Sequence, residues 1–540
     1  MTVRRLLIVG WDCADPDITA SLCARGKLPH LAKIQKRGIH TSIASTVPPS
    51  SLPAWTTAFT GVEPGRHGLT EYVRKEPGAY RLRLASSADR RAETLFSSAH
   101  RAGLRVACLG VPGTWPPEKE LDVCVAGFDS PLSQKAPAEA FVPGFLHEKL
   151  LEKHLHWPFG GVDELAVGPG WHRKARETLL ESTEQKIRVA EEILHSDWFD
   201  LFTVVFSEID TASHHFWAFH DSGSPRHRSD PVLEGTLEDV YVALDRALGR
   251  LLARLDENAA VMVVSDHGAG GASDHVVCLN RWLASLGWLR FKGLSGIPGR
   301  LASMAQGFLS RRLPASFKEA LLRGPAAPLV MRADALSRFG GLDLPDTRAY
   351  SDELPQNPGI WINLRGRDPH GTVEPGTEYE RLRDEIIEKL EAARDAQSGR
   401  PLVARVLKRE EAFAGPCADR APDLLVELAS WDGYKLLAAP SAGRRGKIVR
   451  QLAPSELIGS KGVGVSGVHR SRGILAAAGP GLPDEKSLEK ATLLDVFPLA
   501  ASLLGLKASR DSKPAGTDER VYTPAEEALV KKRLEGLGYL

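Results

Sequence analysis

Short apolar runs alternate with amphipathic stretches along the first half of the chain. The apolar runs are rich in β-favouring residues and predict buried strands at 4–10, 104–111, 200–209 and 259–265. The stretches at 177–194 and 237–255 place apolar residues at three- and four-residue spacing, which predicts amphipathic helices. Alternating strands and helices indicate an α/β fold with a mostly parallel central sheet and helices on both faces.

The pattern changes after about residue 285. The stretch at 292–328 is helical, basic and interrupted by proline and glycine, which is more typical of an insertion or a cap than of a sheet unit. Further along, strands are predicted at 357–367 and 421–429, with a strong helix at 378–395 between them. This region therefore predicts an α+β insertion.

The last part of the chain predicts a return to the main sheet. The run at 472–482 has the character of a core strand, and the residues from Thr523 predict a charged terminal helix. We therefore expect the first part of an α/β core at 1–285, an inserted cap-like region at 286–460, and the rest of the core at 461–540.

Composition and charge narrow the class of protein. The chain has 540 residues, of which 43% are hydrophobic and 25% charged, as in ordinary soluble globular proteins. A net charge of +1 gives no reason to expect nucleic acid or an anionic membrane as a partner. No stretch approaches 18 apolar residues, and the apolar run after Arg5 ends at Asp12, too short for a signal peptide. The six cysteines include no CxxC pair, so we expect reduced thiols in a cytoplasmic protein.

Carboxylates follow three of the predicted strands. Asp12, Asp210 and Asp266 each lie at the end of an apolar run, and His267 follows Asp266 directly. Because the carboxyl ends of parallel strands meet at one edge of a sheet, these side chains are expected to converge. Three converging carboxylates repel one another unless a cation neutralises their charge. The pattern predicts a divalent metal site.

Histidines complete the predicted ligand set. His214 follows Asp210 by four residues, so one helical turn can direct both side chains at one ion, and His469 lies in a glycine-flanked GVH motif. Three carboxylates and three imidazoles suffice for two ions with three protein ligands each. Mixed nitrogen and oxygen ligands favour Zn²⁺, with Mn²⁺ as the less favoured alternative. Two such ions about 4 Å apart stabilise in-line displacement at phosphorus.

The motifs in this order resemble the alkaline phosphatase superfamily, and within it the type I phosphodiesterase/nucleotide pyrophosphatase-like branch. The matching pieces are GWD, PSSLPAWTTAFTGVEPGRHG, DTASH, SDHG and GVH, which extend from residue 10 to residue 469. SDHG followed by LNRWL, and the closing AEEALVKKRLEGLGYL, also resemble a group of bacterial predicted phosphohydrolases or phosphomutases. The resemblance implies two ligand sets: Asp12, Asp266 and His267 for one ion; Asp210, His214 and His469 for the other.

The resemblance also implies a nucleophile. In this branch a serine or threonine two residues before a proline bridges the metals and attacks phosphorus. That position is Ser51 in this chain, with Ser50 as the neighbouring alternative. Coordination to a dication lowers the pKa of a serine hydroxyl, and a helix N-terminus would direct amide groups at the phosphoryl oxygens. Without the metal set, Ser51 would be interpreted as a helix N-cap.

Several nearby polar residues are expected to have structural roles instead. A second SDH follows GAGGA, which predicts a flexible loop and places Asp274 and His275 outside the ligand set. Cys13 is expected to be a small buried residue, and His67 and His215 are expected to lie outside the ligand set. Arg74, Arg90 and Arg91 are candidates for substrate contact, but lone arginines are usually solvated surface residues, which is the role expected here.

One departure from the family pattern affects the substrate. Nucleotide pyrophosphatases carry an asparagine three residues after the nucleophile that holds a phosphoryl oxygen, but this chain has Ala54, followed by Trp55. Nucleotide specificity is therefore not transferred to this chain, and another donor must hold the phosphoryl group.

The function predicted from these residues is hydrolysis of a small phosphate mono- or diester through a phosphoserine intermediate. The alternative is a phosphomutase that uses the same serine and metals while the insertion closes over the substrate. A sulfatase is disfavoured because Trp55 replaces the arginine of its motif, and the complete ligand set argues against a non-catalytic binding protein. The oligomeric state stays open.

Overall fold

The computed structural model describes most of the chain. The described residues are 5–127, 138–159, 162, 168, 170–256, 258–292, 339, 341–441, 443–457, 462–484, 488–506, 521–523, 526–528, 530, 531 and 534. Apart from Lys292, the predicted basic helical stretch at 292–328 lies outside the described residues, as does most of the predicted terminal helix after Thr523. None of the helices formed by the described residues is both long and apolar enough to cross a lipid bilayer.

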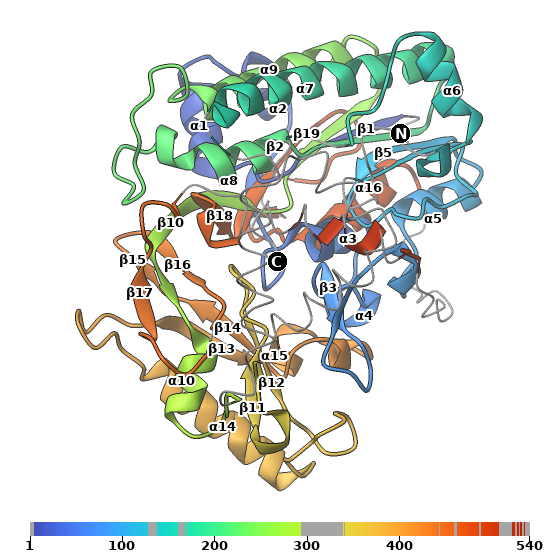
Figure 1. The fold of residues 1–540 in the computed structure, drawn as a ribbon. Helices are drawn as coiled ribbons and strands as arrows, with labels where there is room; N and C mark the ends of the chain where they lie inside the picture. Colours follow the sequence, from blue (N-terminus) through green and yellow to red (C-terminus); the bar gives the residue numbers. More distant parts are fainter. Residues whose placement is uncertain are drawn as a thin grey trace.

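An eight-stranded sheet forms the centre of the molecule (Figure 1). In spatial order its strands are β2 (Ile39–Ala44), β19 (Arg472–Ala478), β9 (Ala260–Val264), β1 (Leu6–Trp11), β8 (Leu201–Phe206), β5 (Val106–Val111), β6 (Val123–Ala126) and β7 (Phe141–Val142). The five strands from β9 to β6 are parallel to one another, whereas β19 and β7 join antiparallel to their neighbours. The predicted α/β fold with a mostly parallel sheet is therefore confirmed, and β19 is the predicted return of the chain to this sheet.

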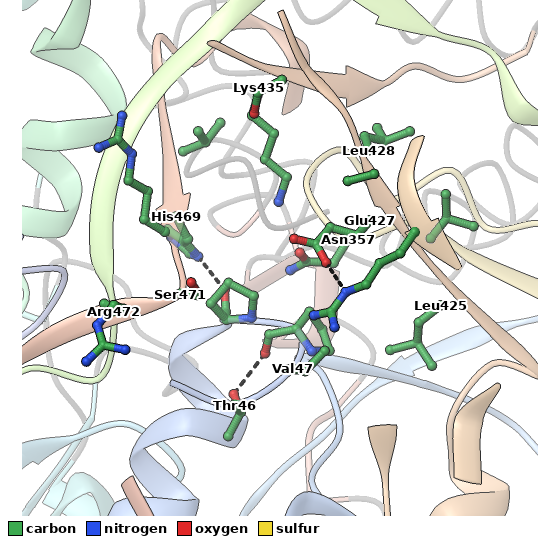
Figure 2. A pocket seen from close by; sticks show the side chains of 18 of the residues that line it. Thr46, Val47, Asn357, Leu425, Glu427, Leu428, Lys435, His469, Ser471 and Arg472 are labelled. Atoms are coloured by element: carbon green, nitrogen blue, oxygen red, sulfur yellow. Dashed lines mark hydrogen bonds and ion pairs between the residues drawn. The ribbon is translucent and has the colours of Figure 1, made fainter. Parts of the chain in front are cut away.

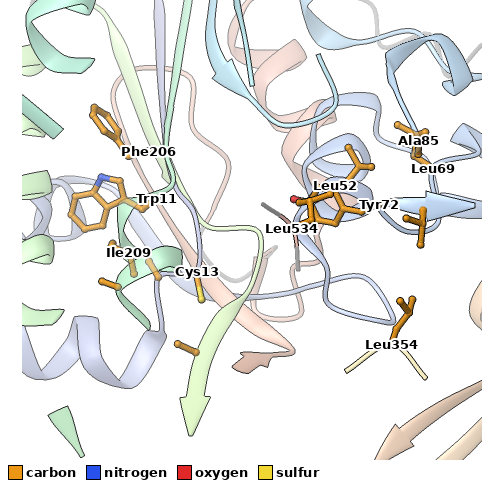
Figure 3. Packing of buried hydrophobic residues seen from close by; sticks show 14 of the residues in the cluster. Trp11, Cys13, Leu52, Leu69, Tyr72, Ala85, Phe206, Ile209, Leu354 and Leu534 are labelled. Atoms are coloured by element: carbon orange, nitrogen blue, oxygen red, sulfur yellow. The ribbon is translucent and has the colours of Figure 1, made fainter. Parts of the chain in front are cut away.

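The helices cover both faces of the central sheet because its strands are apolar on both sides. On β1, Leu7, Val9 and Trp11 contribute to one buried cluster, and Leu6 and Ile8 to another. The first cluster includes residues of the helices α2 (Pro29–Arg37), α7 (Trp171–Ser196), α8 (Glu208–His220) and α9 (Thr236–Leu252). The second includes residues of α3 (Ser51–Thr60), α5 (Leu95–Arg101) and α16 (Val496–Leu503). Figure 3 shows Trp11, Phe206 and Ile209 of the first cluster.

A long strand, β10 (Gly268–Val277), follows the central strand β9 and leads into a second group of sheets, which consists of the sheet that contains β10 and a separate four-stranded sheet. Its first residues pair with β18 (Gly467–Arg470), and its last residues pair with β16 (Tyr434–Ala438) and β17 (Val449–Gln451). The short β15 (Ser430–Trp431) extends this sheet beyond β16. A separate four-stranded sheet has the order β11 (Ala349–Ser351), β12 (Gly359–Ile362), β14 (Leu424–Leu428) and β13 (Val403–Lys408).

The remaining elements are short or lie at the periphery. The remaining strands and helices are β3 (Val73–Lys75), β4 (Leu82–Leu84), α1 (Pro16–Ala24), α4 (Pro64–His67), α6 (Phe145–Glu152), α10 (Leu279–Ser285), α14 (Thr377–Glu391) and α15 (Arg409–Ala412). Of these, α14 is the strong helix predicted between two strands of the insertion. The domain boundaries at residues 286 and 460 stay a prediction.

The GAGGA segment is a strand, so the predicted flexible loop is wrong. Asp274 and His275 lie within β10, where His275 Nδ1 is 2.7 Å from Asp274 Oδ1. The glycines allow close packing: a Cβ atom on Gly268 would lie 2.3 Å from the carbonyl oxygen of Arg472, and one on Gly271 would lie 2.5 Å from the Tyr434 ring. Glycine is needed here because other segments of the same chain pack closely against these positions, and not because the backbone must bend.

The prediction that Arg74 and Arg90 are solvated surface residues is also wrong. Both are buried: Arg74 Nη1 lies 3.0 Å from Asp89 Oδ1, and Arg90 donates to the carbonyl oxygen of Gly113 at 3.0 Å and pairs with Glu118. Buried charges require such partners, so these arginines brace the loop before α5.

Candidate metal centre

The carboxyl ends of β1, β8 and β9 meet at one edge of the central sheet. Trp11 pairs with Phe206 and Gly10 with Val264, so the three strands end at the same level. Asp12 follows β1 directly, and Asp266 and His267 follow β9. The predicted convergence of strand ends is therefore present.

Asp210 reaches the same edge from a helix and not from a strand end. Strand β8 ends at Phe206, and α8 begins at Glu208, so the prediction of a strand over 200–209 with Asp210 at its end is wrong. The four-residue spacing still places Asp210 and His214 on one face of α8, with 3.2 Å between Asp210 Oδ1 and His214 Nε2. His469 joins them from β18, which pairs with β10 at Ala269.

The six predicted ligands form two groups in the structure. Within each group the donor atoms lie within 4.8 Å of one another; the groups are Asp12, Asp266 and His267, and Asp210, His214 and His469. All six side chains are buried. The groups adjoin each other, because the His267 and His469 rings stack with centroids 3.8 Å apart. The division matches the two ligand sets that the family resemblance implies.

Each of the three histidines turns one ring nitrogen toward a backbone carbonyl. His214 Nδ1 lies 2.8 Å from the carbonyl oxygen of Gly467, His267 Nδ1 3.2 Å from that of Gly268, and His469 Nδ1 2.9 Å from that of Pro49. An Nδ1–H that donates to a carbonyl leaves the Nε2 lone pair free for a metal ion, which is the usual orientation of a histidine ligand.

The electrostatics of the site call for a cation. Burial raises the pKa of Asp12 well above its usual range, and the charges of Asp266 and Asp210 raise it further. Burial likewise raises the pKa of Asp266 to about 8. Among the described residues, neither carboxylate forms an ion pair with a lysine or arginine. Asp266 Oδ2 accepts no hydrogen bond from the part of the chain that the structure describes, although it lies 3.1 Å from His267 Nε2. A divalent ion would compensate these buried charges.

In the second group the pKa of the carboxylate shifts in the opposite direction, and an ionised carboxylate and a neutral imidazole are favoured. Burial works to raise the pKa of Asp210, but His214 and His469 together lower it well below the usual range. Burial lowers the pKa of His469 to about 3, so this imidazole is neutral at physiological pH. A neutral imidazole beside an ionised carboxylate is the state in which both side chains bind metal.

Ser51 lies at the first position of α3, with its hydroxyl directed at the first group. Its Oγ is 3.0 Å from His267 Nε2 and 3.3 Å from Asp12 Oδ1, and the side chain is fully buried. Ser50 points elsewhere and donates to Glu71 Oε1 at 2.7 Å. Ser50 occupies the N-cap position of α3, but its side chain makes no capping hydrogen bond.

Trp55 contacts the first group through Asp12, and no pattern in the sequence predicts this contact. Its Nε1 donates to Asp12 Oδ2 at 2.9 Å, from a fully buried position one helical turn after Ser51. Ala54 is buried and offers no side-chain donor. On the opposite side, the backbone amide of His469 donates to Gln356 Oε1 at 2.9 Å. No local motif marks either contact, because the partners are far apart in the sequence.

The residues expected to be structural behave differently from one another. His67 and His215 are buried away from the two groups, with His67 Nε2 at 3.0 Å from Thr57 Oγ1 and His215 against the Trp171 ring. Cys13 is buried as expected, but its Sγ lies within 4.8 Å of a ring nitrogen of His267 and of His469. The thiol is therefore a further donor atom at the junction of the two groups.

A cavity of about 650 Å³ opens beside the site (Figure 2). His469 and the loop at 46–49 form part of one wall, and residues of β13, β14 and β16 form the other. The cavity therefore lies between the central sheet and the second group of sheets, next to His469.

Comparison with known proteins identifies related sequences and folds. The family model described as type I phosphodiesterase / nucleotide pyrophosphatase matches residues 6–446. The structure is similar to that of phosphonoacetate hydrolase from Sinorhizobium meliloti 1021 in complex with phosphonoformate, with a TM-score of 0.50, 16% identity, and coverage of 93% of this chain and 96% of that one. It is also similar to human ectonucleotide pyrophosphatase / phosphodiesterase 5, with a TM-score of 0.48, 14% identity, and coverage of 94% and 96%. No curated protein matches the chain significantly.

Proposed function

Because the chain belongs to the type I phosphodiesterase / nucleotide pyrophosphatase family, we propose that it is a metal-dependent phosphohydrolase that acts through a phosphoserine on Ser51. The observation that carries the proposal is the pair of three-residue donor groups, with donor atoms within 4.8 Å, beside the Ser51 hydroxyl. The substrate class is a small phosphate mono- or diester.

The residues fit two divalent ions. Asp12, Asp266 and His267 would hold one ion, and Asp210, His214 and His469 the other. The mixed carboxylate and imidazole donors, with a thiol nearby, favour Zn²⁺ over Mn²⁺. When bound, such ions neutralise charge on the phosphoryl oxygens and lower the pKa of the attacking hydroxyl.

Ser51 supplies the attacking oxygen. Its hydroxyl proton passes to solvent, its Oγ forms a bond to phosphorus, and the bond from phosphorus to the leaving-group oxygen breaks, so that this oxygen takes up a proton and leaves as an alcohol. Water then attacks the phosphoserine and restores the serine, with one water consumed overall. Because α3 begins at Ser51, its first backbone amides would be the donors to the phosphoryl oxygens in place of the missing side-chain donor at Ala54.

A phosphomutase is the second candidate, because the cavity beside the site has walls from both parts of the molecule. A substrate held between these walls could keep its place while the phosphoryl group returns to another hydroxyl. A mutase converts a phosphosugar or phosphoglycerate to its isomer without release of free phosphate, which a phosphate assay combined with product chromatography distinguishes from hydrolysis.

The remaining features of the proposal concern location and organisation. All six cysteines are free in the structure, which supports a reducing, cytoplasmic location. We also propose that residues 286–460 form the inserted cap and that the protein has no nucleic-acid partner, as its net charge of +1 suggests.

Hydrolysis of 4-nitrophenyl phosphate and bis(4-nitrophenyl) phosphate by the metal-loaded protein tests the proposal. Activity on either ester should disappear in Ser51→Ala while the metal content stays unchanged, and Ser50→Ala is the matched control. The preferred ester distinguishes a monoesterase from a diesterase. Full activity in Ser51→Ala would exclude this serine as the nucleophile.

A further inference from the structure

We propose that the leaving group of the substrate carries an anionic group of its own, a carboxylate or a phosphate, which Lys435 binds in the cavity beside His469. The inference rests on the proposed function, because it names the substrate class of the same site.

The geometry of the reaction assigns the leaving group to this cavity. In an in-line displacement the leaving oxygen departs on the side of phosphorus opposite the nucleophile. Ser51 approaches from the group that contains Asp12 and His267, so the leaving oxygen faces the group that contains His469. His469 lines the cavity, whose volume of about 650 Å³ is sufficient for a small organic group.

Charged side chains of the cavity differ in whether they already have partners. Arg405 Nε donates to Glu427 Oε2 at 2.5 Å, and Arg472 donates to Ser42 Oγ from its Nε at 3.0 Å. On the acidic side, Asp15 Oδ1 accepts from the amides of Asp17 and Ile18 and caps α1. Each of these charged groups already has a partner within the protein.

Lys435 has no such partner. Its side chain forms no hydrogen bond or ion pair with any residue of the described ranges, and Figure 2 shows it extending into the cavity between His469 and Glu427. The side chain is half-buried in strand β16, and this burial lowers its pKa to about 8 while Glu427 opposes the shift. The second cation without a partner, Arg470, is exposed at the rim of the cavity.

A partly desolvated ammonium with no protein partner is costly unless a ligand supplies the anion. Glu427 attracts Lys435 through its charge, but its ion pair is with Arg405, and it forms none with Lys435 among the described residues. Apolar residues, among them Val47, Leu425 and Leu428, line the cavity beside polar residues such as Thr46 and Asn357. The ligand that fits is therefore a small organic group that bears the phosphoester oxygen at one end and an anion at the other.

Binding of leaving-group analogues tests the inference without catalysis. The probes are 4-hydroxybenzoate, 4-hydroxyphenylphosphonate and the uncharged isostere 4-hydroxybenzamide, titrated calorimetrically into the metal-loaded protein. We expect one of the anionic phenols to bind at least about tenfold more tightly than the amide, as one charge-assisted contact provides. The tighter of the two anions distinguishes a carboxylate from a phosphate.

Variants separate Lys435 from direct binding of the anion to the metals. Lys435→Met should abolish the preference for the anion while the metal content stays unchanged, and the exposed Lys36→Met is the control that should retain it. Equal affinity for all probes in the wild type, no binding of any probe, or an unchanged preference in Lys435→Met would overturn the inference.

A kinetic arm distinguishes this outcome from failure of the proposed function. Release of the phenol from 4-carboxyphenyl phosphate and 4-carbamoylphenyl phosphate, or from their methyl diesters, should show the lower KM for the carboxylate in the wild type only. If neither ester is hydrolysed while the anionic phenol still binds through Lys435, the proposed function fails and the anion site stands.

Discussion

Replacing Trp55 by phenylalanine should weaken binding of one of the two metal ions about tenfold to a hundredfold. The change removes the indole Nε1 that donates to Asp12 Oδ2 at 2.9 Å, and leaves the other oxygen of Asp12 facing Ser51. Without this donor the carboxylate is less well held, and a metal ligand depends on such supporting contacts for its orientation.

The magnitude follows from the character of the hydrogen bond. A hydrogen bond to a charged group contributes about 1.5–3 kcal/mol, and each ~1.4 kcal/mol is a factor of ten in affinity. Trp55 is fully buried, so water does not replace the lost donor. The substitution also removes ring atoms that pack against Gly10, which costs about 1–3 kcal/mol of folding stability.

A matched variant separates the two effects. Trp11 is equally buried on the neighbouring strand, but its Nε1 forms no hydrogen bond with any described residue. Trp11→Phe should therefore lower the melting temperature by a similar amount and leave metal affinity nearly unchanged.

The assay is competition for Zn²⁺ with a chromophoric chelator, which resolves two binding steps, together with thermal unfolding of the metal-free proteins. In Trp55→Phe one step should weaken and the other should not. Equal metal affinities in Trp55→Phe and wild type, with both variants folded, would refute the view that Trp55 holds Asp12 for the metal.

Three further predictions follow from contacts around the site. Gly467→Ala would place a Cβ atom 2.0 Å from the carbonyl oxygen of Ser213. We therefore expect the free energy of unfolding in urea to fall by ~1–3 kcal/mol and one metal ion to bind more weakly. The control is Gly341→Ala, which should be neutral because a Cβ atom there would have nothing within 4 Å. The amine of Lys435, whose pKa lies at about 8, attracts an anion only when it is protonated. The affinity for 4-hydroxybenzoate or 4-hydroxyphenylphosphonate should therefore be highest below pH 8 and fall as the pH rises through 8, which calorimetric titration at several pH values measures. Removal of metal with a chelator should lower the melting temperature, since ions that bind only the folded state stabilise it; an unchanged melting temperature would contradict the two-metal account.

Local patterns were sufficient for part of the site. Asp12 and Asp266 could be placed because parallel strands of similar length bring their carboxyl ends together. The placement of Asp210 and His214 on one face did not depend on the strand boundary, because side chains four residues apart on a helix point to the same side whichever residue begins the helix.

Contacts between distant segments could not be predicted in this way. The donation from Trp55 to Asp12, the support of His469 by Gln356 and the place of Lys435 in the cavity depend on how separate elements pack. The same limit explains the error for Arg74, whose buried partner, Asp89, lies on a different element and leaves no periodic signal.

Acid quenching of the metal-loaded protein during turnover tests the central claim most directly. Peptide mass spectrometry after incubation with the preferred phosphate ester should locate a phosphoryl group on Ser51, absent from Ser51→Ala and retained in Ser50→Ala. Rapid turnover with no phosphorylated serine, or with the phosphoryl group on Ser50, would contradict the account.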